Sequence, residues 1–316
     1  MVVPRTLRAP LPLLLLVALV ALAVAAVALA RTGEEPAEVR AATGASGAAG
    51  TSDPSAAAPE RLPAPSEPLP RGTAGLATAL TQTTRRLRLA IETWTALDGT
   101  TSSEPPQAVT LLALHQQRLY RRLADDPAQA DRVVARLAPG VRGEARDVVL
   151  ARRALGRIRR SGRAPAVRTA AAAPPEELRR AYAGAERRFG VPRDVLAAVN
   201  LVESAFGRVR SASEAGARGP MQFLPATWRQ YGLGGDIDEP RDAILGAANY
   251  LSRSGARRDL DGALFAYNHS RDYVRAIRAF ATRMRAGEHA FETYYAWQAF
   301  MRTAGGTRRL TGPGRG

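Results

Sequence analysis

Glu203 is the residue whose surroundings best suit acid–base chemistry. It lies near the end of a stretch beginning at Val191 in which apolar residues recur at helical spacing, and it follows Val199 by four positions. This spacing places the carboxyl against the core, where burial raises a carboxyl pKa and keeps the group protonated near neutral pH, as a general acid requires. Position alone does not separate this role from that of a solvated glutamate at a helix end.

Several short motifs follow Glu203 in order. ESAFG begins at Glu203, SEAGARGPMQ spans residues 213–222, and FLPATW runs on from there to Trp228. Farther along, AILGAANYL precedes ALFAYNHS, which contains Tyr267 and Asn268. Together these motifs resemble the lytic transglycosylase domain of the lysozyme-like superfamily, and the resemblance covers roughly residues 175–303.

The resemblance implies roles for five residues. Glu203 corresponds to the catalytic acid and base, and Ser213 and Gln222 correspond to residues that line the sugar site beside it. Tyr267 corresponds to a hydroxyl that hydrogen-bonds the catalytic carboxyl, and Asn268 to a substrate contact. Each of the last four also has a structural alternative, as a turn residue, a surface amide or a core aromatic. The joint order of the motifs favours the functional interpretation.

The implied reaction is cleavage of the bond between N-acetylmuramic acid and N-acetylglucosamine in peptidoglycan. Most glycosidases use two carboxylates, but Glu214 falls in a predicted loop and the acidic run GGDIDEP (234–240) has the composition of a helix start. A substrate-assisted mechanism needs one protein acid, so it agrees with Glu203 alone and would leave 1,6-anhydro ends. A hydrolytic muramidase on the same fold and a non-catalytic wall-binding protein are the alternatives.

The sequence predicts no cofactor and no metal. GGDIDEP lacks the alternating acidic positions and terminal glutamate of a calcium loop, and a helix N-cap at Asp238 explains it more simply. His269 and His289 do not have the spacing of zinc ligands.

The elements that must position these residues are mainly helical, so the predicted fold class is mainly α. A lysozyme-like catalytic domain over 175–303 is preceded by a small helical domain of unknown role over 72–160, in which apolar residues recur at helical spacing. An Ala- and Pro-rich linker at 161–174 separates the two. The last stretch, AFMRTAGGTRRLTGPGRG, predicts a small hairpin around Gly305 and Gly306 followed by a loose end, and the C-terminal tail is bounded at 304–316.

The N-terminal part predicts export. Residues 1–30 contain Arg5 and Arg8 followed by an uncharged apolar run, which we interpret as a signal anchor or a cleaved signal peptide. Residues 31–71 are rich in Ala, Pro and Gly and predict a disordered linker. The expected location is therefore outside the cytoplasmic membrane, anchored to it through the N-terminal helix or secreted into the wall.

Charge and cysteine content limit the partners. The 45 basic residues are all arginine and exceed the 29 acidic ones, for a net charge of +16, and there is no cysteine. A basic surface attracts any polyanion, but the export segment argues against nucleic acid. Arginines concentrated at 141–170 suit either a solvated helix face, which we favour, or an anionic wall surface. The expected partners are glycan strands, the membrane and other wall enzymes.

Overall fold

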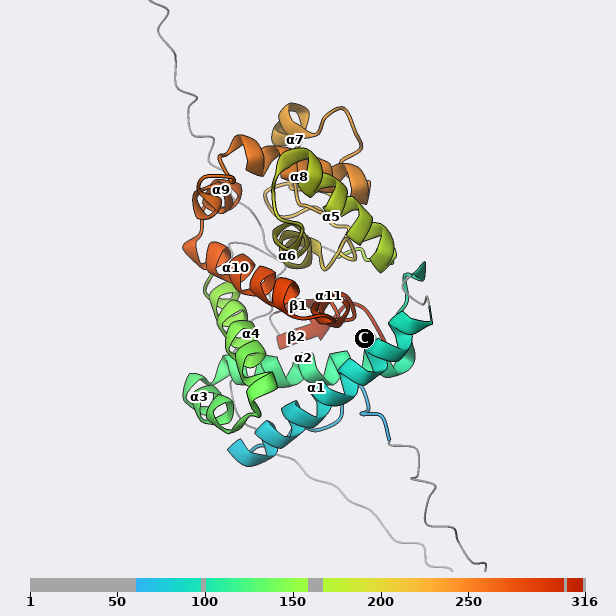
Figure 1. Ribbon diagram of the computed structural model, residues 1–316, viewed down its shortest axis with the longest axis vertical. Coiled ribbons are helices and arrows are strands. Elements are labelled where there is room, and N and C mark those ends of the chain that lie inside the picture. The colour runs from blue at the N-terminus through green and yellow to red at the C-terminus, as the bar shows by residue number, and fades with distance from the viewer. Residues whose placement is uncertain (1–60, 98–100, 159–166, 304–305, 315–316) are drawn as a thin grey trace, which may run out of the picture.

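The computed structural model describes residues 61–97, 101–158, 167–303 and 306–314, and it confirms the mainly α class (Figure 1). The predicted export segment, residues 1–30, and the linker up to residue 60 lie outside these ranges. Within the described residues, no helix is both long and apolar enough to cross a membrane.

Four helices form the first half of the described chain: α1 (Thr73–Ala96), α2 (Gln107–Asp125), α3 (Pro127–Arg136) and α4 (Pro139–Arg157). Proline occupies the first positions of α3 and α4, where its missing N–H has no intrahelical partner to lose. The predicted apolar stripes are buried, from Leu76 to Trp94 in α1 and from Leu112 to Leu123 in α2. The helical periodicity of this region is thus confirmed.

The second half contains seven helices and a hairpin within the described residues. The helices are α5 (Pro175–Phe189), α6 (Arg193–Ser204), α7 (Pro225–Tyr231), α8 (Pro240–Arg253), α9 (Leu260–Tyr267), α10 (Arg271–Ala286) and α11 (Ala290–Tyr295). Strands β1 (Phe300–Thr303) and β2 (Gly306–Arg309) pair antiparallel, with Thr303 opposite Gly306. The hairpin predicted in the tail is confirmed.

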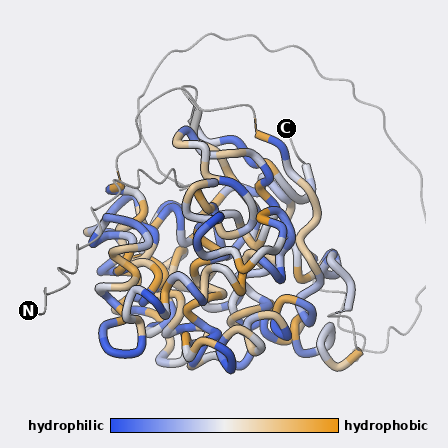
Figure 2. Tube along the Cα trace, turned by 90° about the horizontal axis from the view of Figure 1, so that it is seen from above, coloured by the Kyte–Doolittle hydropathy of each residue, from blue (hydrophilic) through white to orange (hydrophobic). Residues whose placement is uncertain are grey.

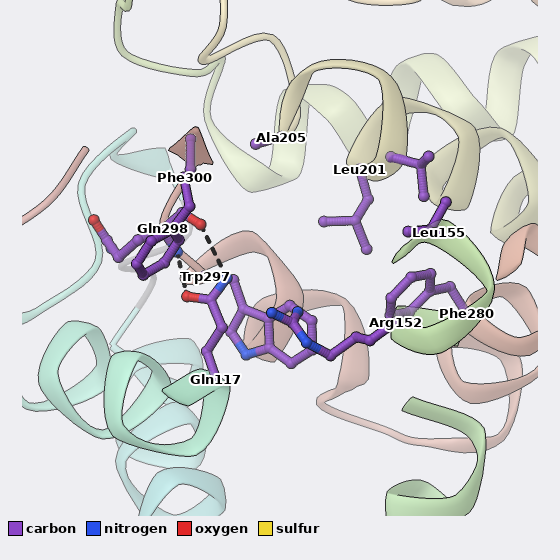
Figure 3. A pocket seen from close by; sticks show the side chains of 11 residues that line it. Gln117, Arg152, Leu155, Leu201, Ala205, Phe280, Trp297, Gln298 and Phe300 are labelled. Atoms are coloured by element: carbon purple, nitrogen blue, oxygen red, sulfur yellow. Dashed lines mark hydrogen bonds between the residues drawn. The ribbon is translucent and has the colours of Figure 1, made fainter. Parts of the chain in front are cut away.

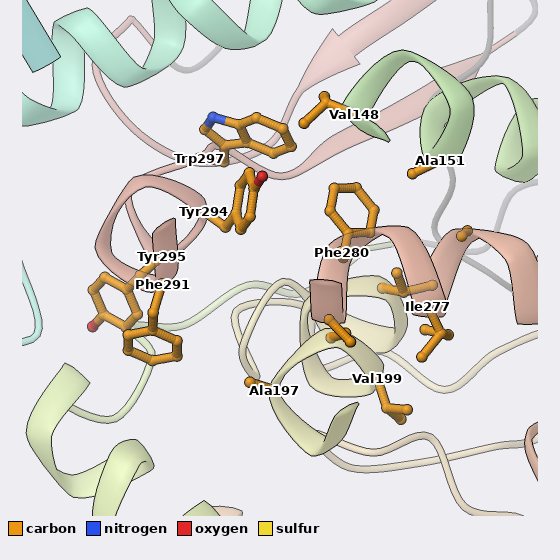
Figure 4. Packing of buried hydrophobic residues seen from close by; sticks show 14 of the residues in the cluster. Val148, Ala151, Ala197, Val199, Ile277, Phe280, Phe291, Tyr294, Tyr295 and Trp297 are labelled. Carbon is orange, nitrogen blue, oxygen red and sulfur yellow. The ribbon is translucent and has the colours of Figure 1, made fainter. Parts of the chain in front are cut away.

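Helix α10 joins the two halves, because it packs against α4 on one side and α6 on the other (Figure 1). Figure 4 shows Phe280 and Ile277 of α10 near Val148 of α4, with Val199 of α6 on the opposite side. Trp297 packs edge-to-face on Phe280. One apolar core therefore extends through the segments predicted as a small helical domain and a catalytic domain.

Apolar and hydrophilic stretches alternate along the chain, as expected for amphipathic helices (Figure 2).

Two polar clusters also hold the core together. The Glu144 carboxylate on α4 accepts hydrogen bonds from Gln116 Nε2 at 3.1 Å and from Tyr120 OH at 2.9 Å, both on α2, and from Arg88 on α1. The amide of Gln117 holds the backbone of Gln298, donating to its carbonyl at 2.9 Å and accepting from its N–H at 3.0 Å. Buried polar groups need such partners. The Glu144 contacts therefore fix α1 and α2 against α4, and the Gln117 contacts fix α2 against the segment that contains Gln298.

Candidate active site

Helix α6 carries Glu203 in its last turn and ends abruptly behind it. Ala205 and Phe206 have φ values of 52° and 61°, and Gly207 continues this left-handed stretch at 82°. Left-handed backbone is unfavourable for residues with a side chain, but burial of the Phe206 ring against Phe291 and Tyr295 offsets the cost. The reversal places Glu203 at a sharply defined helix end.

The Glu203 carboxyl is fully buried, at 0% exposure, as the helical spacing predicts. Its Oε1 accepts a hydrogen bond from Tyr273 OH at 2.8 Å, whereas its Oε2 is buried and has no hydrogen-bond partner among the residues that the structure describes. Burial raises the pKa of Glu203 to about 8, and the Tyr273 hydrogen bond opposes this in part. The group is therefore protonated at neutral pH, with one oxygen unengaged.

The predicted role of Tyr267 is wrong in one respect, because Tyr267 is not the phenol bonded to Glu203. Tyr267 is the last residue of α9 and donates instead to the carbonyl of Met221 at 2.6 Å. Tyr273 stands in the first turn of α10, the helix that packs on α6, and this packing directs its hydroxyl to the carboxyl. The two phenol rings stack with centroids 6.5 Å apart. Tyr267 therefore lies beside Tyr273, and Tyr273 makes the contact with Glu203 that was expected of Tyr267.

Ser204 ties the end of α6 to the loop that follows. Its hydroxyl donates to the carbonyl of Pro220 at 2.5 Å and accepts from the N–H of Gly207 at 2.8 Å. Ser204 is fully buried. Sequence reasoning assigned it no role, although its place in the Glu-Ser pair was the available signal.

Gln222 lies in a tight turn, GPMQ, closed by paired backbone hydrogen bonds between Arg218 and Phe223 at 2.8 and 2.9 Å. Its φ is 51°, and its side chain is buried and donates to the carbonyl of Gly219 at 3.1 Å. Gly219 itself has a φ of 74°, and a Cβ there would meet the Ile237 carbonyl oxygen at 1.9 Å. This turn presents Met221, the acceptor of the Tyr267 hydroxyl, toward the tyrosine pair.

Ser213 and Asn268 occupy different settings. Ser213 is half-buried, and its hydroxyl oxygen accepts from the N–H of Ala217 at 2.9 Å, which gives it the turn role considered as its alternative. Asn268 ends α9 and is buried, and its Nδ2 has no hydrogen-bond acceptor. The sugar contacts of Ser213 and Asn268 remain predictions. The Nδ2 group of Asn268 could donate a hydrogen bond to a sugar, because it has no acceptor among the described residues.

Comparison with known families agrees with this geometry. Residues 180–286 match the family model described as the transglycosylase SLT domain. This segment is similar to that domain, and we call it the SLT domain. It makes up about a third of the chain and contains every predicted site residue, as well as Tyr273 and Ser204. No curated protein and no solved structure matches the chain. The family resemblance is thereby confirmed, and it supports peptidoglycan cleavage of the lytic transglycosylase type at family level.

The acidic run in the SLT domain has a structural setting. Asp238 pairs with Arg218 at 2.6 Å, and Asp236 accepts from the backbone N–H of Asp238 at 2.9 Å. The predicted N-cap at Asp238 is wrong by one residue: α8 is preceded by Glu239, whose side chain makes no capping bond. In the described ranges, no cluster of three or more His, Cys, Asp or Glu side chains is arranged to hold a metal ion.

Tyr273, like Ser204, is a residue of the SLT domain that the sequence analysis missed. It stands four residues before Ile277, and both face the core. That apolar spacing in α10 was the signal that placed its ring inside. Burial and the nearby Glu203 raise the pKa of Tyr273 well above its usual range. The phenol therefore keeps its proton and donates a hydrogen bond to the carboxyl.

Proposed function

We propose that the protein is a peptidoglycan lytic transglycosylase in which Glu203 is the only acid and base. The observation that carries the proposal is a fully buried carboxyl with a pKa raised to about 8 and with Oε2 unpaired. A general acid works best when its pKa lies near the operating pH. Burial causes the rise and the Tyr273 hydrogen bond opposes it, so the pKa of Glu203 does not depend on a second carboxylate.

The proposed reaction proceeds in two steps. Protonated Glu203 donates its proton to the glycosidic oxygen as the bond to C1 of the N-acetylmuramic acid breaks, and the acetamido oxygen of the same sugar bonds to C1. The Glu203 carboxylate then takes the proton of the sugar's 6-hydroxyl, whose oxygen attacks C1 and displaces the acetamido oxygen. A 1,6-anhydro ring closes, no water is consumed, and Glu203 is protonated again.

Access to Glu203 is part of the proposal. Because the carboxyl is closed off from solvent, a glycan must displace covering groups before Oε2 can reach the bond. We assign this opening to the GPMQ turn, which is held to its neighbours by the hydrogen bonds of the Tyr267 hydroxyl to Met221 and of the Ser204 hydroxyl to Pro220. Sugar contacts from Gln222, Ser213 and Asn268 would replace those bonds in the bound state.

The proposed location is outside the cytoplasmic membrane. It rests on the sequence of residues 1–30, which predicts a signal anchor or signal peptide, and on the substrate class of the family. In this arrangement the part of the predicted linker before residue 61 carries the folded part into the wall, because Leu62 and Leu69 already pack against the core. Other wall enzymes are the expected partners there.

Product analysis of digested peptidoglycan tests the reaction. The full chain is incubated with purified walls, and the new glycan ends are identified by mass spectrometry. Anhydro ends support the transglycosylase, and reducing ends would establish the muramidase alternative instead.

The variant Glu203→Gln tests the acid. It keeps the size of the side chain but cannot donate a proton, so we expect turnover to fall by about 10²–10⁴-fold while binding to walls in a sedimentation assay is retained. An exposed glutamate of the same domain, Glu214→Gln, is the matched control and should keep full activity. Equal activity of the two variants would show that Glu203 is not the catalytic acid.

A further inference from the structure

A cavity of about 60 Å³ is lined by residues of α2, α4, α6 and α10. It is bordered by Gln117 of α2, Arg152 of α4, Leu201 of α6 and Phe280 of α10, with Trp297 as a further wall (Figure 3). Glu203 does not line it. The cavity therefore belongs to the junction between the first four helices and the SLT domain.

Arg152 is the unusual residue of this cavity. Its side chain is buried, at 7% exposure, and within the described part of the chain no group accepts a hydrogen bond from its guanidinium, whose Nη2 is buried without a partner. The guanidinium carbon lies over the ring of Trp297, 5.4 Å from the ring centroid. A buried cation without an acceptor is strongly unfavourable, so the guanidinium needs an anion that can accept its hydrogen bonds.

The charges around Arg152 add to this conclusion. Burial and the neighbouring Arg121 both lower the pKa of Arg152, and Asp125 opposes them with a smaller effect. Two arginines near one another in a low-dielectric setting repel, and an anion between the walls would relieve that repulsion. A solvated helix face was expected for the arginine-rich stretch 141–170, and this expectation is wrong for Arg152, which is buried.

The other groups around the cavity are already satisfied or apolar. The amide of Gln117 is fully engaged with the backbone of Gln298 on both its oxygen and its nitrogen. The rest of the lining is mostly aliphatic or aromatic, with Leu155, Leu201 and Phe280 facing the space (Figure 3). The cavity thus combines one unpaired cation with apolar walls.

We propose that this cavity binds a small monocarboxylate, or the carboxylate end of a larger molecule, with its oxygens on Arg152 and its apolar carbons against Leu155 and Leu201. A guanidinium matches a carboxylate through two parallel hydrogen bonds. The volume holds about four to six water-sized groups, the size of propionate. Inorganic phosphate fits less well, because it has no apolar part and needs more donors than one arginine supplies.

Thermal unfolding of the full chain tests the site independently of glycan cleavage. Sodium propionate, compared with sodium chloride at equal ionic strength, is expected to raise the Tm of the wild type in proportion to the logarithm of its concentration. Arg152→Met should abolish this rise and, by removing an unpaired charge, increase the Tm without ligand. Arg146→Met, an exposed arginine on the same helix, is the control and should keep the propionate response.

Several outcomes would overturn the proposal: no Tm rise of the wild type in propionate, an equal rise in sodium phosphate, or an equal rise in Arg152→Met and Arg146→Met. If the methionine variant does not fold, Arg152→Lys replaces it. Lysine keeps the charge but loses the paired donors, so a clearly weaker response to propionate is expected. An unchanged response of that variant would also overturn the proposal.

Discussion

The carboxyl of Glu203 is held in a state that favours chemistry over stability. Its pKa is about 8 in the folded chain against 4.5 for an ordinary glutamate. Between these two values the folded state binds a proton that the unfolded state has released, so the free energy of unfolding falls as pH rises from about 4.5 to about 8. The raised pKa of Glu203 is thus maintained at a cost in stability that the surrounding core must offset.

Tyr273→Phe should change the pH dependence of cleavage. The Tyr273 hydroxyl stabilises the charged form of Glu203 and lowers its pKa, so its removal raises that pKa further. Activity that requires protonated Glu203 is lost as pH rises through this pKa, and the alkaline limb of the kcat/KM profile should therefore move to higher pH. Rates measured on purified walls across pH 5 to 10 check the shift.

The control for this variant is Tyr250→Phe, because the Tyr250 hydroxyl donates to the carbonyl of Ala266 at 2.8 Å and is not a cause of the Glu203 pKa shift. Its alkaline limb should stay where that of the wild type lies. A shift toward lower pH in Tyr273→Phe would contradict the assigned effect of the phenol on Glu203.

At the scale of elements, the GPMQ turn is the part that the backbone defines most strictly. Gly219→Ala would push a Cβ onto the Ile237 carbonyl oxygen, which cannot move away cheaply because it is backbone. We expect a loss of several kcal/mol, roughly 3–5, in the free energy of unfolding by urea, with loss of turnover. Gly216→Ala is the matched control: its φ is also positive, at 79°, but its Cβ would meet nothing within 4 Å, so about 1 kcal/mol is expected. Similar losses for both variants would contradict the close approach.

The sequence predicted local elements well and distant pairings poorly. The apolar stripe of α1 and the tail hairpin depend on residues close in the chain, and both are confirmed. The phenol bonded to Glu203 was assigned to Tyr267 instead of Tyr273, because 70 residues separate Tyr273 from Glu203 and only the packing of α10 on α6 joins them. Helical spacing identifies a buried face, but it does not say which neighbour that face meets.

At the scale of the whole molecule, the first four helices and the SLT domain share one core. Phe280 of α10 and Trp297 pack with residues of α4 as well as α6. The domain boundary expected at residues 161–174 remains a prediction. The shared core means that the two halves stabilise one another. The segment without a family match thus supports the helix that bears Glu203.

Gln117→Ala tests this mutual support. It would leave the buried N–H and carbonyl of Gln298 without partners, 181 residues away in sequence. Each unpaired buried group costs about 1–3 kcal/mol, so the urea midpoint of the full chain should fall clearly. Gln107→Ala, an exposed glutamine at the start of the same helix, should be close to neutral. An equally mild effect of both would show that the contact adds little.

The abrupt end of α6 has an electrostatic consequence. Aligned peptide dipoles give a helix C-terminus a partial negative charge of about half an electron, and a carboxylate there is destabilised by typically about 0.3–1 kcal/mol. Glu203 stands in the last turn because the chain reverses at Ala205. The backbone itself therefore favours the neutral form of this acid, whereas the Tyr273 hydrogen bond favours the charged form.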